Sequence, residues 1–299
     1  MSALTVLDER EIWHGPLCDA ARRRGYDAVR IRRGSEAAGR TGLGFLRPHA
    51  VPKILEQNHA DWWQMSHLTM VQDFAQVEVY EDKSTQFFRW GKWMPRTWRF
   101  ENREQAIDFV ASYHGTLVSK ADVGASSYNV RVLQTQADQL GHVRQLFGQG
   151  VRVDHCAGGP GGQSVQSVQR GYALLQEYIP HDVTYRVNAV GRARAIFKRY
   201  NKPGTLTAQT GNVDGIVELD DRLESLLRFA NVIFEEIGTR WCALDILERG
   251  HEWVLLETSL AWPWPSPGNC MQARFFGTDR RWAEMWDVLL DEYEAGVWG

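Results

Sequence analysis

The chain has 299 residues, of which 43% are hydrophobic and 24% are charged, and its formal net charge is −3. This length is sufficient for two or three compact units with substantial cores. No stretch approaches the roughly 18 uncharged apolar residues of a membrane-spanning helix, and the N-terminus lacks the layout of a signal peptide, so a soluble, cytoplasmic protein is expected.

The cysteines and tryptophans add two constraints. Cys18, Cys156, Cys242 and Cys270 are widely separated and form no CxxC pair, which argues against a structural zinc site and against a disulfide framework. The chain also contains 13 tryptophans. Most of them are expected in cores or interfaces, and a minority in the wall of a pocket.

Residues 1–82 alternate between short apolar runs and a helical pattern. The predicted strands are Ala3–Leu7, Ala28–Ile31, Leu43–Leu46 and Val77–Tyr80, and a helix is predicted from Glu11 to Arg24, closed by Gly25. This alternation favours a small Rossmann-like parallel sheet with helices on its faces. No GxGxxG motif occurs, so a dinucleotide site is not predicted.

A cluster of arginines lies in the same region: Arg22, Arg23, Arg24, Arg30, Arg32 and Arg33. Such a cluster can bind nucleic acid or a phosphorylated substrate, or it can be an ordinary solvated surface. The acidic overall balance favours the solvated surface.

The middle of the chain alternates helix and strand again. Helices are predicted at Lys83–Gly91 and Glu101–Tyr113 with a Pro-containing linker between them, and strands at Thr116–Lys120 and Asn129–Leu133. The two strands flank a small-residue loop, Gly124–Ser127, which has no GxxxxGK[ST] motif. Such a loop can close over a phosphate that Lys120 reaches as a point charge, although a surface lysine is the plain alternative.

A second group of strands follows a glycine-rich segment, Cys156–Gln166, which is predicted to be a loop or an insertion. Tyr172–Ile179 is predicted as a buried strand, and Thr184–Tyr200 as a hairpin around Gly191. The predicted register places Arg186 and Asn188 with Arg194 and Lys198 on a polar face, and the apolar face is made by Tyr185, Val187, Ala189, Ala193, Ala195 and Phe197. The polar face either neutralises an anionic ligand or is simply exposed.

The last third of the chain contains a pair of carboxylates in apolar strands. The amphipathic helix Asp221–Ile237 leads into strands Trp241–Arg249 and Trp253–Ser259, joined by the three-residue loop Gly250–Glu252. That loop places Asp245 opposite Glu257, about 5 Å apart at their Cβ atoms. Two such acids repel each other and are costly to bury unless a cation lies between them, which indicates a divalent metal. The alternative is a solvated surface pair. A Pro/Trp loop, Ala261–Asn269, and a helix, Arg280–Tyr293, complete the chain.

Together, these features resemble the ATP-grasp superfamily between about Asp82 and Ser259, and the glutathione synthetase and glutamate-ligase branch in particular. The similar segments, in chain order, are Asp82-Lys83 with Pro95-Arg96-Thr97, Lys120 with Gly124 and Val130, Gln176–Ile179, Arg186–Gly191 with Arg199, and Asp245 with Glu257.

The resemblance implies a mixed α/β and α+β fold in which two α+β subdomains sandwich ATP behind a small parallel α/β domain. The implied boundaries are residues 1–94, 95–180 with the glycine flap, and 181–299 with the metal-binding hairpin. Three positions depart from the family pattern. Ser259 stands where an asparagine is usual, the flap is poor in glycine, and Asp182 precedes Arg186 by four residues rather than two.

The resemblance also implies site residues. Lys83 and Lys120 would contact the phosphates of ATP, the backbone around Glu177, Tyr178 and Ile179 the adenine, and Asp182 the ribose. The implied metal ligands for Mg²⁺ are Asp245, Glu257 and Ser259, and the implied catalytic residues are Arg186 and Arg199, which would neutralise developing charge.

The expected activity is an ATP-dependent carboxylate–amine ligase that forms an amide through an acylphosphate and releases ADP and phosphate. The expected partners are a small-molecule or peptide carboxylate and an amine, with no membrane and no nucleic acid, and the sequence contains no indication of the oligomeric state. Two alternatives stay open: a kinase-like phosphotransferase with the same fold, and a nucleotide-binding protein whose catalysis is impaired.

Overall fold

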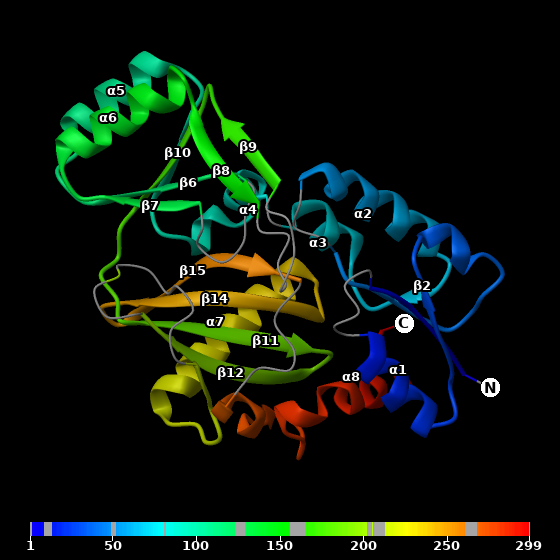
Figure 1. The fold of residues 1–299 in the computed structure, drawn as a ribbon. Helices are drawn as coiled ribbons and strands as arrows, with labels where there is room; N and C mark the ends of the chain where they lie inside the picture. Colours follow the sequence, from blue (N-terminus) through cyan, green and yellow to red (C-terminus); the bar gives the residue numbers. More distant parts are fainter. Residues whose placement is uncertain are drawn as a thin grey trace.

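The fold was analysed in a computed structural model, which describes residues 2–8, 14–48, 52–80, 82–122, 129–155, 165–201, 205, 213–260 and 268–298. Three main sheets organise the described part of the chain (Figure 1). The predicted flap Gly124–Ser127 lies outside the described residues, as do Trp262 and Trp264 of the Pro/Trp loop.

The N-terminal sheet is parallel, as predicted. It contains β1 (Ala3–Leu7), β2 (Asp27–Ile31), β3 (Leu43–Leu46) and β4 (Thr69–Met70) in the order β2-β1-β3-β4. The helical elements of this unit are α1 (His14–Arg23), the short η1 (Gly34–Ala37), α2 (Pro52–Met65) and α3 (Phe74–Val79). Its apolar strands are buried on both faces, as expected for a parallel sheet covered by helices.

One predicted strand of this unit is wrong. Residues 77–80 lie in α3 and the turn after it, and the fourth strand is β4, eight residues earlier. The alternating valines Val77 and Val79 suit a strand, but both are buried within a short helix that begins after Asp73. Four residues are too few to separate period 2 from one face of a helix, and tertiary packing decided between them.

The second sheet is antiparallel and has the order β5-β10-β6-β7. Its strands are β5 (Thr97–Phe100), β6 (Leu117–Lys120), β7 (Val130–Leu133) and β10 (Ala173–Glu177). Helices α5 (Arg103–Ser112) and α6 (Gln136–Phe147) pack together against one face, and a separate hairpin is formed by β8 (Val151–His155) and β9 (Val165–Gln169). No element was predicted for α6, β8 or β9, and β5 takes in the end of the predicted linker. Residues 156–164 of the predicted loop Cys156–Gln166 lie outside the described residues, and its last two residues begin β9.

The third sheet has six strands in the order β13-β12-β11-β14-β15, with β16 paired to β12. Its strands are β11 (Val183–Val190), β12 (Ala193–Tyr200), β13 (Val213–Gly215), β14 (Trp241–Arg249), β15 (Glu252–Ser259) and β16 (Phe275–Phe276). Its antiparallel hairpins β11–β12 and β14–β15 were both predicted.

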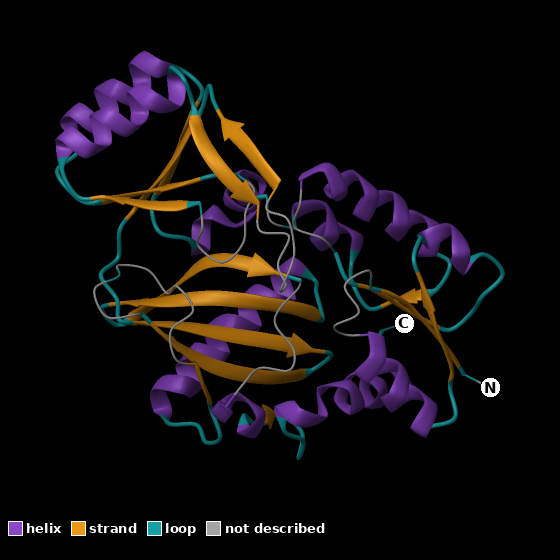
Figure 2. Cartoon of the chain, in the orientation of Figure 1, coloured by secondary structure: helices purple, strands orange, loops and turns teal. Residues whose placement is uncertain are grey.

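Helix α7 (Asp221–Ile237) packs across one face of the third sheet (Figure 2). It begins as the sequence predicts, because the Asp220 carboxylate accepts a hydrogen bond from the N–H of Leu223 at 2.8 Å. It ends at Gly238, whose φ of 73° is left-handed and therefore suits glycine. The β5-β10-β6-β7 sheet, which we call the facing sheet, lies beyond β15, the last strand in the order of the six-stranded sheet (Figure 1).

The remaining helical elements connect or close these units. Helix α4 (Lys83–Trp90) and η2 (Gly91–Trp93) link the N-terminal unit to β5, and η3 (Gly268–Gln272), η4 (Trp282–Glu284) and α8 (Met285–Glu294) close the chain. The last of these packs against α1 (Figure 1). In the described part of the chain, no helix combines the length and the apolar character that crossing a bilayer requires.

The contact between α8 and α1 accounts for part of the arginine cluster. Arg24 forms ion pairs with three acids of α8, at 3.1 Å to Asp287, 2.7 Å to Asp291 and 3.5 Å to Glu294. Its side chain is therefore occupied within the protein, whereas Arg22 and Arg23 stay more than half exposed.

The N-terminal unit and the third sheet share one hydrophobic core, with Trp241 at its centre. This side chain is fully buried, meets the ring of Phe45 edge-on at 5.1 Å, and stacks on Trp286 of α8 at 6.1 Å. Its indole N–H donates to the carbonyl of Leu260 at 3.0 Å. One residue thus joins β3, β14 and α8.

We expect Trp241→Ala to lower the free energy of unfolding by roughly 3–5 kcal/mol, because it leaves a cavity and an unpaired carbonyl in this shared core. Denaturant titration followed by circular dichroism measures the change. The control is Trp63→Ala, since Trp63 is 59% exposed and should cost less than about 1 kcal/mol. Equal losses in the two variants would contradict a shared core centred on Trp241.

Candidate active site

The predicted carboxylate pair exists: Asp245 of β14 lies directly opposite Glu257 of β15. The route to this pairing differs from the prediction. The loop has two residues rather than three, because Arg249 pairs with Glu252, and on its own this register would move Glu257 out of alignment with Asp245. A β-bulge next to Asp245 shifts the register by one residue and restores the pair.

Asp245 is the most strongly engaged acid of the site. Its carboxylate accepts two hydrogen bonds from Arg186, at 2.7 Å from Nε and 2.6 Å from Nη2, and lies 3.3 Å from Nη1 of Arg199. The side chain is only 6% exposed. A bidentate guanidinium on a buried carboxylate is a strong and directional contact.

The two arginines reach the same acid because of the register of β11 and β12. Arg186 pairs across the ladder with both Asp245 and Phe197, while Arg199 pairs with Thr184. Residues opposite each other share a face, and Thr184 lies two residues before Arg186 and therefore on the same face of β11. Arg199, opposite Thr184, thus shares a face with Arg186 and Asp245.

The predicted register of this hairpin is wrong by one residue. Its turn contains only Gly191 and Arg192, with Gly191 at φ 60°, whereas the prediction implied a three-residue turn. The slip moves Arg194 and Lys198 to the opposite face. There the Arg194 guanidinium donates to Asn231 of α7 at 2.9 Å and lies 4.7 Å from the Phe234 ring centroid.

Two lysines complete the charged cluster, which we define as Lys83, Lys120, Arg186, Arg199, Asp245 and Glu257. Lys83 is the first residue of α4, and its Nζ lies 3.8 Å from Oε2 of Glu257. Lys120 is the last residue of β6 in the facing sheet. Both lysines are more than 90% buried, which is unusual for this residue type unless it is paired.

The cluster is electrostatically coupled. Burial raises the pKa of Asp245, but the charges of Arg186 and Arg199 and the hydrogen bonds to Arg186 and Glu257 outweigh that effect and hold the pKa below its usual range. Burial lowers the pKa of Lys120 to about 8, with Glu257 and Asp245 opposing the decrease and Lys83 adding to it. Four cations therefore surround two carboxylates.

This donor set suits a magnesium ion. Mg²⁺ prefers oxygen ligands and is often held by one or two carboxylates together with substrate phosphates, so Asp245 and Glu257 suffice as protein ligands. Ser259 is buried and pairs with Ala243 two positions beyond Glu257, which puts its hydroxyl on the same face. Among the described residues, no group of three or more His, Cys, Asp or Glu side chains forms a closed metal site.

A small apolar patch lies at the hinge, the name used here for residues 178–182, which connect β10 of the facing sheet to β11 of the six-stranded sheet. Ile179 packs with Leu247, Val254 and Leu256, and the first three are buried. Leu247 follows Asp245 by two residues in β14 and so shares its face.

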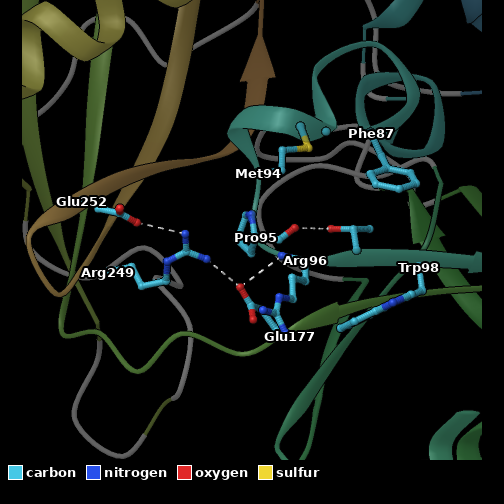
Figure 3. A pocket seen from close by; sticks show the side chains of 10 residues that line it. Phe87, Met94, Pro95, Arg96, Trp98, Glu177, Arg249 and Glu252 are labelled. Atoms are coloured by element: carbon cyan, nitrogen blue, oxygen red, sulfur yellow. Dashed lines mark hydrogen bonds and ion pairs between the residues drawn. The ribbon is translucent and has the colours of Figure 1, made fainter. Parts of the chain in front are cut away.

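The side chain of Glu177 lines a cavity of about 810 Å³ (Figure 3). Its carboxylate accepts hydrogen bonds from the backbone N–H of Arg96 at 3.1 Å and from Arg249 at 2.9 Å. Apolar side chains of Phe87, Met94, Pro95 and Trp98 line the rest of this cavity. Glu177 thus ties β5 to the tip of the β14–β15 hairpin.

The remaining predicted positions lie along the hinge. The N–H of Tyr178 is already bonded to the carbonyl of Thr116 at 3.1 Å, and Asp182 is exposed just before β11. Neither side chain forms part of the charged cluster. The structure therefore brings six of the predicted site residues together, places Ser259 on the same face and leaves Glu177, Tyr178, Ile179 and Asp182 at the hinge.

Comparisons with known proteins identify the fold. No protein-family model and no curated protein matches the sequence. Among solved structures, the chain is similar to a RimK domain ATP-grasp protein from Sphaerobacter thermophilus, with 18% identity, 87% of this chain and 91% of that chain covered, and a TM-score of 0.58. It is also similar to the ATP-grasp ligase PsnB complexed with a minimal precursor, with 13% identity, coverages of 98% and 99%, and a TM-score of 0.62.

A third similar structure is the D-alanine–D-alanine ligase from Bacillus anthracis complexed with ATP, with 11% identity, 99% of this chain and 98% of that chain covered, and a TM-score of 0.62. The chain has the ATP-grasp fold. The near-complete coverage in both directions shows that the N-terminal parallel sheet belongs to the shared architecture. The predicted fold class is confirmed.

Two sets of contacts around the charged cluster were not predicted. Gln86 and Asp122 connect α4 to both facing sheets, and the interaction between Glu177 and Arg249 closes the hinge. The helical pattern of residues 83–90 indicated α4 but not the partners of its polar side chains. Residues 86 and 258 are 172 positions apart in the sequence, and no local sequence pattern predicts a contact between them.

The lowered pKa of Lys120 predicts that its ammonium loses its proton near pH 8, more than two units below an ordinary lysine. Nitrogen-detected NMR titration of the lysine side chains measures this. Glu257→Gln should lower the pKa further, because the variant removes the largest charge that favours the ammonium. Titration of every lysine near its ordinary value would show that Lys120 is not buried in this cluster.

Proposed function

We propose that this chain is an ATP-dependent carboxylate–amine ligase, which joins an acid to an amine through an acylphosphate. The observation that carries the proposal is the charged cluster in an ATP-grasp fold: two carboxylates, two buried lysines and two arginines, each from a different helix or strand. Phosphoryl transfer needs positioning and neutralisation of charge rather than a protein nucleophile, and these groups provide both.

The triphosphate of ATP would lie between the facing sheets. Lys83 and Lys120 would bind its phosphates. Both ammonium groups lie beside Glu257, one of the two proposed metal ligands, so they would be close to the phosphates that the ion contacts. The apolar patch around Ile179 would support the adenine. Backbone groups at Glu177 and Ile179 and the exposed Asp182 are the proposed contacts to the adenine edge and the ribose.

Asp245 and Glu257 would hold Mg²⁺ against the phosphates, with Ser259 as a weaker third ligand. The ion would supply charge neutralisation on the transferring phosphoryl group. Arg186 now binds both oxygens of Asp245, so it would share that carboxylate with the ion. The N–H groups of Arg186 that are not bonded to Asp245, with Arg199, would neutralise charge on the transferring phosphoryl group and on the oxyanion that forms when the amine attacks the acyl carbon.

In this reaction, the substrate carboxylate attacks the γ-phosphorus of ATP, ADP leaves, and the acylphosphate keeps the transferred phosphoryl group. The amine then attacks the acyl carbon and inorganic phosphate leaves with its electron pair. The similar structures support this class of chemistry: one is named D-alanine–D-alanine ligase and another is the ATP-grasp ligase PsnB complexed with a precursor peptide and AMPPNP. For this chain, we propose an amino acid or a peptide as the acid.

The deciding experiment measures ADP and phosphate release while an amino acid and peptide panel is supplied with Mg²⁺ and hydroxylamine as a general amine. We expect release of ADP and phosphate, with a hydroxamate as the product, only when the correct acid is present. A kinase-like enzyme would instead retain the phosphoryl group on its product. ATP binding without turnover across the panel would favour a protein with impaired catalysis.

Asp245→Asn and Glu257→Gln should each reduce kcat/KM for ATP by at least about 100-fold, because each removes one charge from the proposed metal site. Steady-state assays at several Mg²⁺ concentrations measure the loss. Glu252→Gln is the matched control, since Glu252 begins the same strand but is exposed and pairs only with Arg249 among the described residues. Its kcat/KM should stay within about twofold of wild type.

A further inference from the structure

One buried side chain replaces a missing strand beside the proposed metal site. Among the described residues, β15 is the last strand on its side of the six-stranded sheet, and its one paired edge is bonded to β14. On the other edge, the side-chain amide of Gln86 donates to the carbonyl of Thr258 at 3.2 Å and accepts from the Thr258 N–H at 3.0 Å. Gln86 is only 1% exposed. Its amide therefore makes both bonds that a neighbouring strand would make.

Thr258 is the position at which these bonds matter most. It lies between Glu257 and Ser259, the last two proposed metal ligands. Side chains alternate along a strand, so fixing the backbone of Thr258 fixes the direction in which both neighbours point. An edge strand with a bulge beside Asp245 has fewer constraints of its own than an inner strand.

Gln86 also fixes the distance to a phosphate-binding lysine. It lies three residues after Lys83, within the first turn of α4, and the Lys83 ammonium is 3.8 Å from Glu257. The same amide donates to the carbonyl of Val79 at 3.2 Å, which ties α4 to the end of α3. The Gln86 side chain thus joins the element that carries Lys83 to the strand that carries Glu257.

The other side of α4 is attached to the facing sheet through Asp122, two residues beyond Lys120. The Lys83 N–H donates to the Asp122 carbonyl at 2.8 Å, and the Ser84 hydroxyl donates to the Asp122 carboxylate in a short hydrogen bond. The Asp122 N–H lies 3.4 Å from the hydroxyl of Tyr172. Helix α4 is consequently bonded both to β15, which carries Glu257, and to Asp122, which follows β6 and its last residue Lys120.

We propose that Gln86 is a positioning residue that acts through Thr258 to hold Glu257 in register with Lys83, and so sets the affinity of the site for the divalent ion that accompanies ATP. This rests on the proposed function, since it assigns Glu257 to the metal. Gln86 itself touches neither the ion nor the nucleotide. A glutamine with only a structural role would change stability without changing metal affinity.

The test compares Gln86→Met with Gln139→Met. Gln139 is also 1% exposed, and its amide donates to two carbonyls, those of Gly115 and Leu133, away from the charged cluster. Both variants lose buried hydrogen bonds at similar volume, so both should lose similar stability in a denaturant titration. A difference in metal affinity between the two variants would then result from the position of Gln86 beside Thr258, and not from a difference in stability.

The readout is Mn²⁺ affinity in the presence of a non-hydrolysable ATP analogue, measured by electron paramagnetic resonance as a probe of the Mg²⁺ site. We expect Gln86→Met to weaken Mn²⁺ binding by about 10- to 100-fold, the range seen when the supporting contacts of a metal ligand are removed, and Gln139→Met to stay within about twofold of wild type. Equal affinities in the two variants would overturn the inference. If Gln86→Met does not fold, Gln86→Asn, which withdraws the amide by one methylene, must show the same selective loss.

Failure of the inference differs from failure of the proposed function. If the wild-type protein binds no Mn²⁺ with the ATP analogue, the metal assignment of Glu257 is wrong and both proposals fall. If wild type binds and Gln86→Met binds equally well, only the role of Gln86 is refuted.

Discussion

The site depends on one buried charge, the carboxylate of Asp245. A charged acid at this depth costs free energy unless partners replace its hydration, and Arg186 and Arg199 provide that replacement from the neighbouring strands. This requirement fixes the order of the elements. The acid must lie on an inner strand, the arginines must lie on the next hairpin with matching register, and the second acid must follow on the far side. The sheet order β12-β11-β14-β15 satisfies all three conditions.

The cluster is polarised across the gap between the sheets. The acids and arginines belong to the six-stranded sheet, while Lys120 comes from the facing sheet and Lys83 from α4, which is bonded to both. Within the protein, the four cations of the cluster interact with Asp245 and Glu257. A polyanion bound beside them would add further ion pairs with the same cations. The hinge contact between Glu177 and Arg249 joins the same two surfaces at their other end. Under the proposed function, phosphate recognition and the relative placement of the sheets would therefore be linked through α4 and the contact between Glu177 and Arg249.

The sequence predicted the composition of the cluster better than its geometry. Asp245, Glu257 and Lys120 stand out because charged residues interrupt apolar strands, and strand periodicity is local information. Turn lengths were less accessible, since both hairpins have a two-residue turn where three were predicted. In β11–β12 this error placed Arg194 and Lys198 on the same face as Arg186, whereas both lie on the opposite face. In β14–β15 the bulge cancelled it. Gln86 and Asp122 left no local signal because their partners are distant in sequence, and residues 77–80 formed a helix because burial outweighed a four-residue pattern.

The most direct test of the account is calorimetric titration of the protein with a non-hydrolysable ATP analogue, with and without Mg²⁺. If the paired acids hold a divalent ion against the phosphates, Mg²⁺ should tighten binding at least about 10-fold in wild type and by much less in Asp245→Asn. Binding that is absent, or that is equally tight with and without Mg²⁺ in both proteins, would contradict the assignment of this charged cluster to magnesium and ATP.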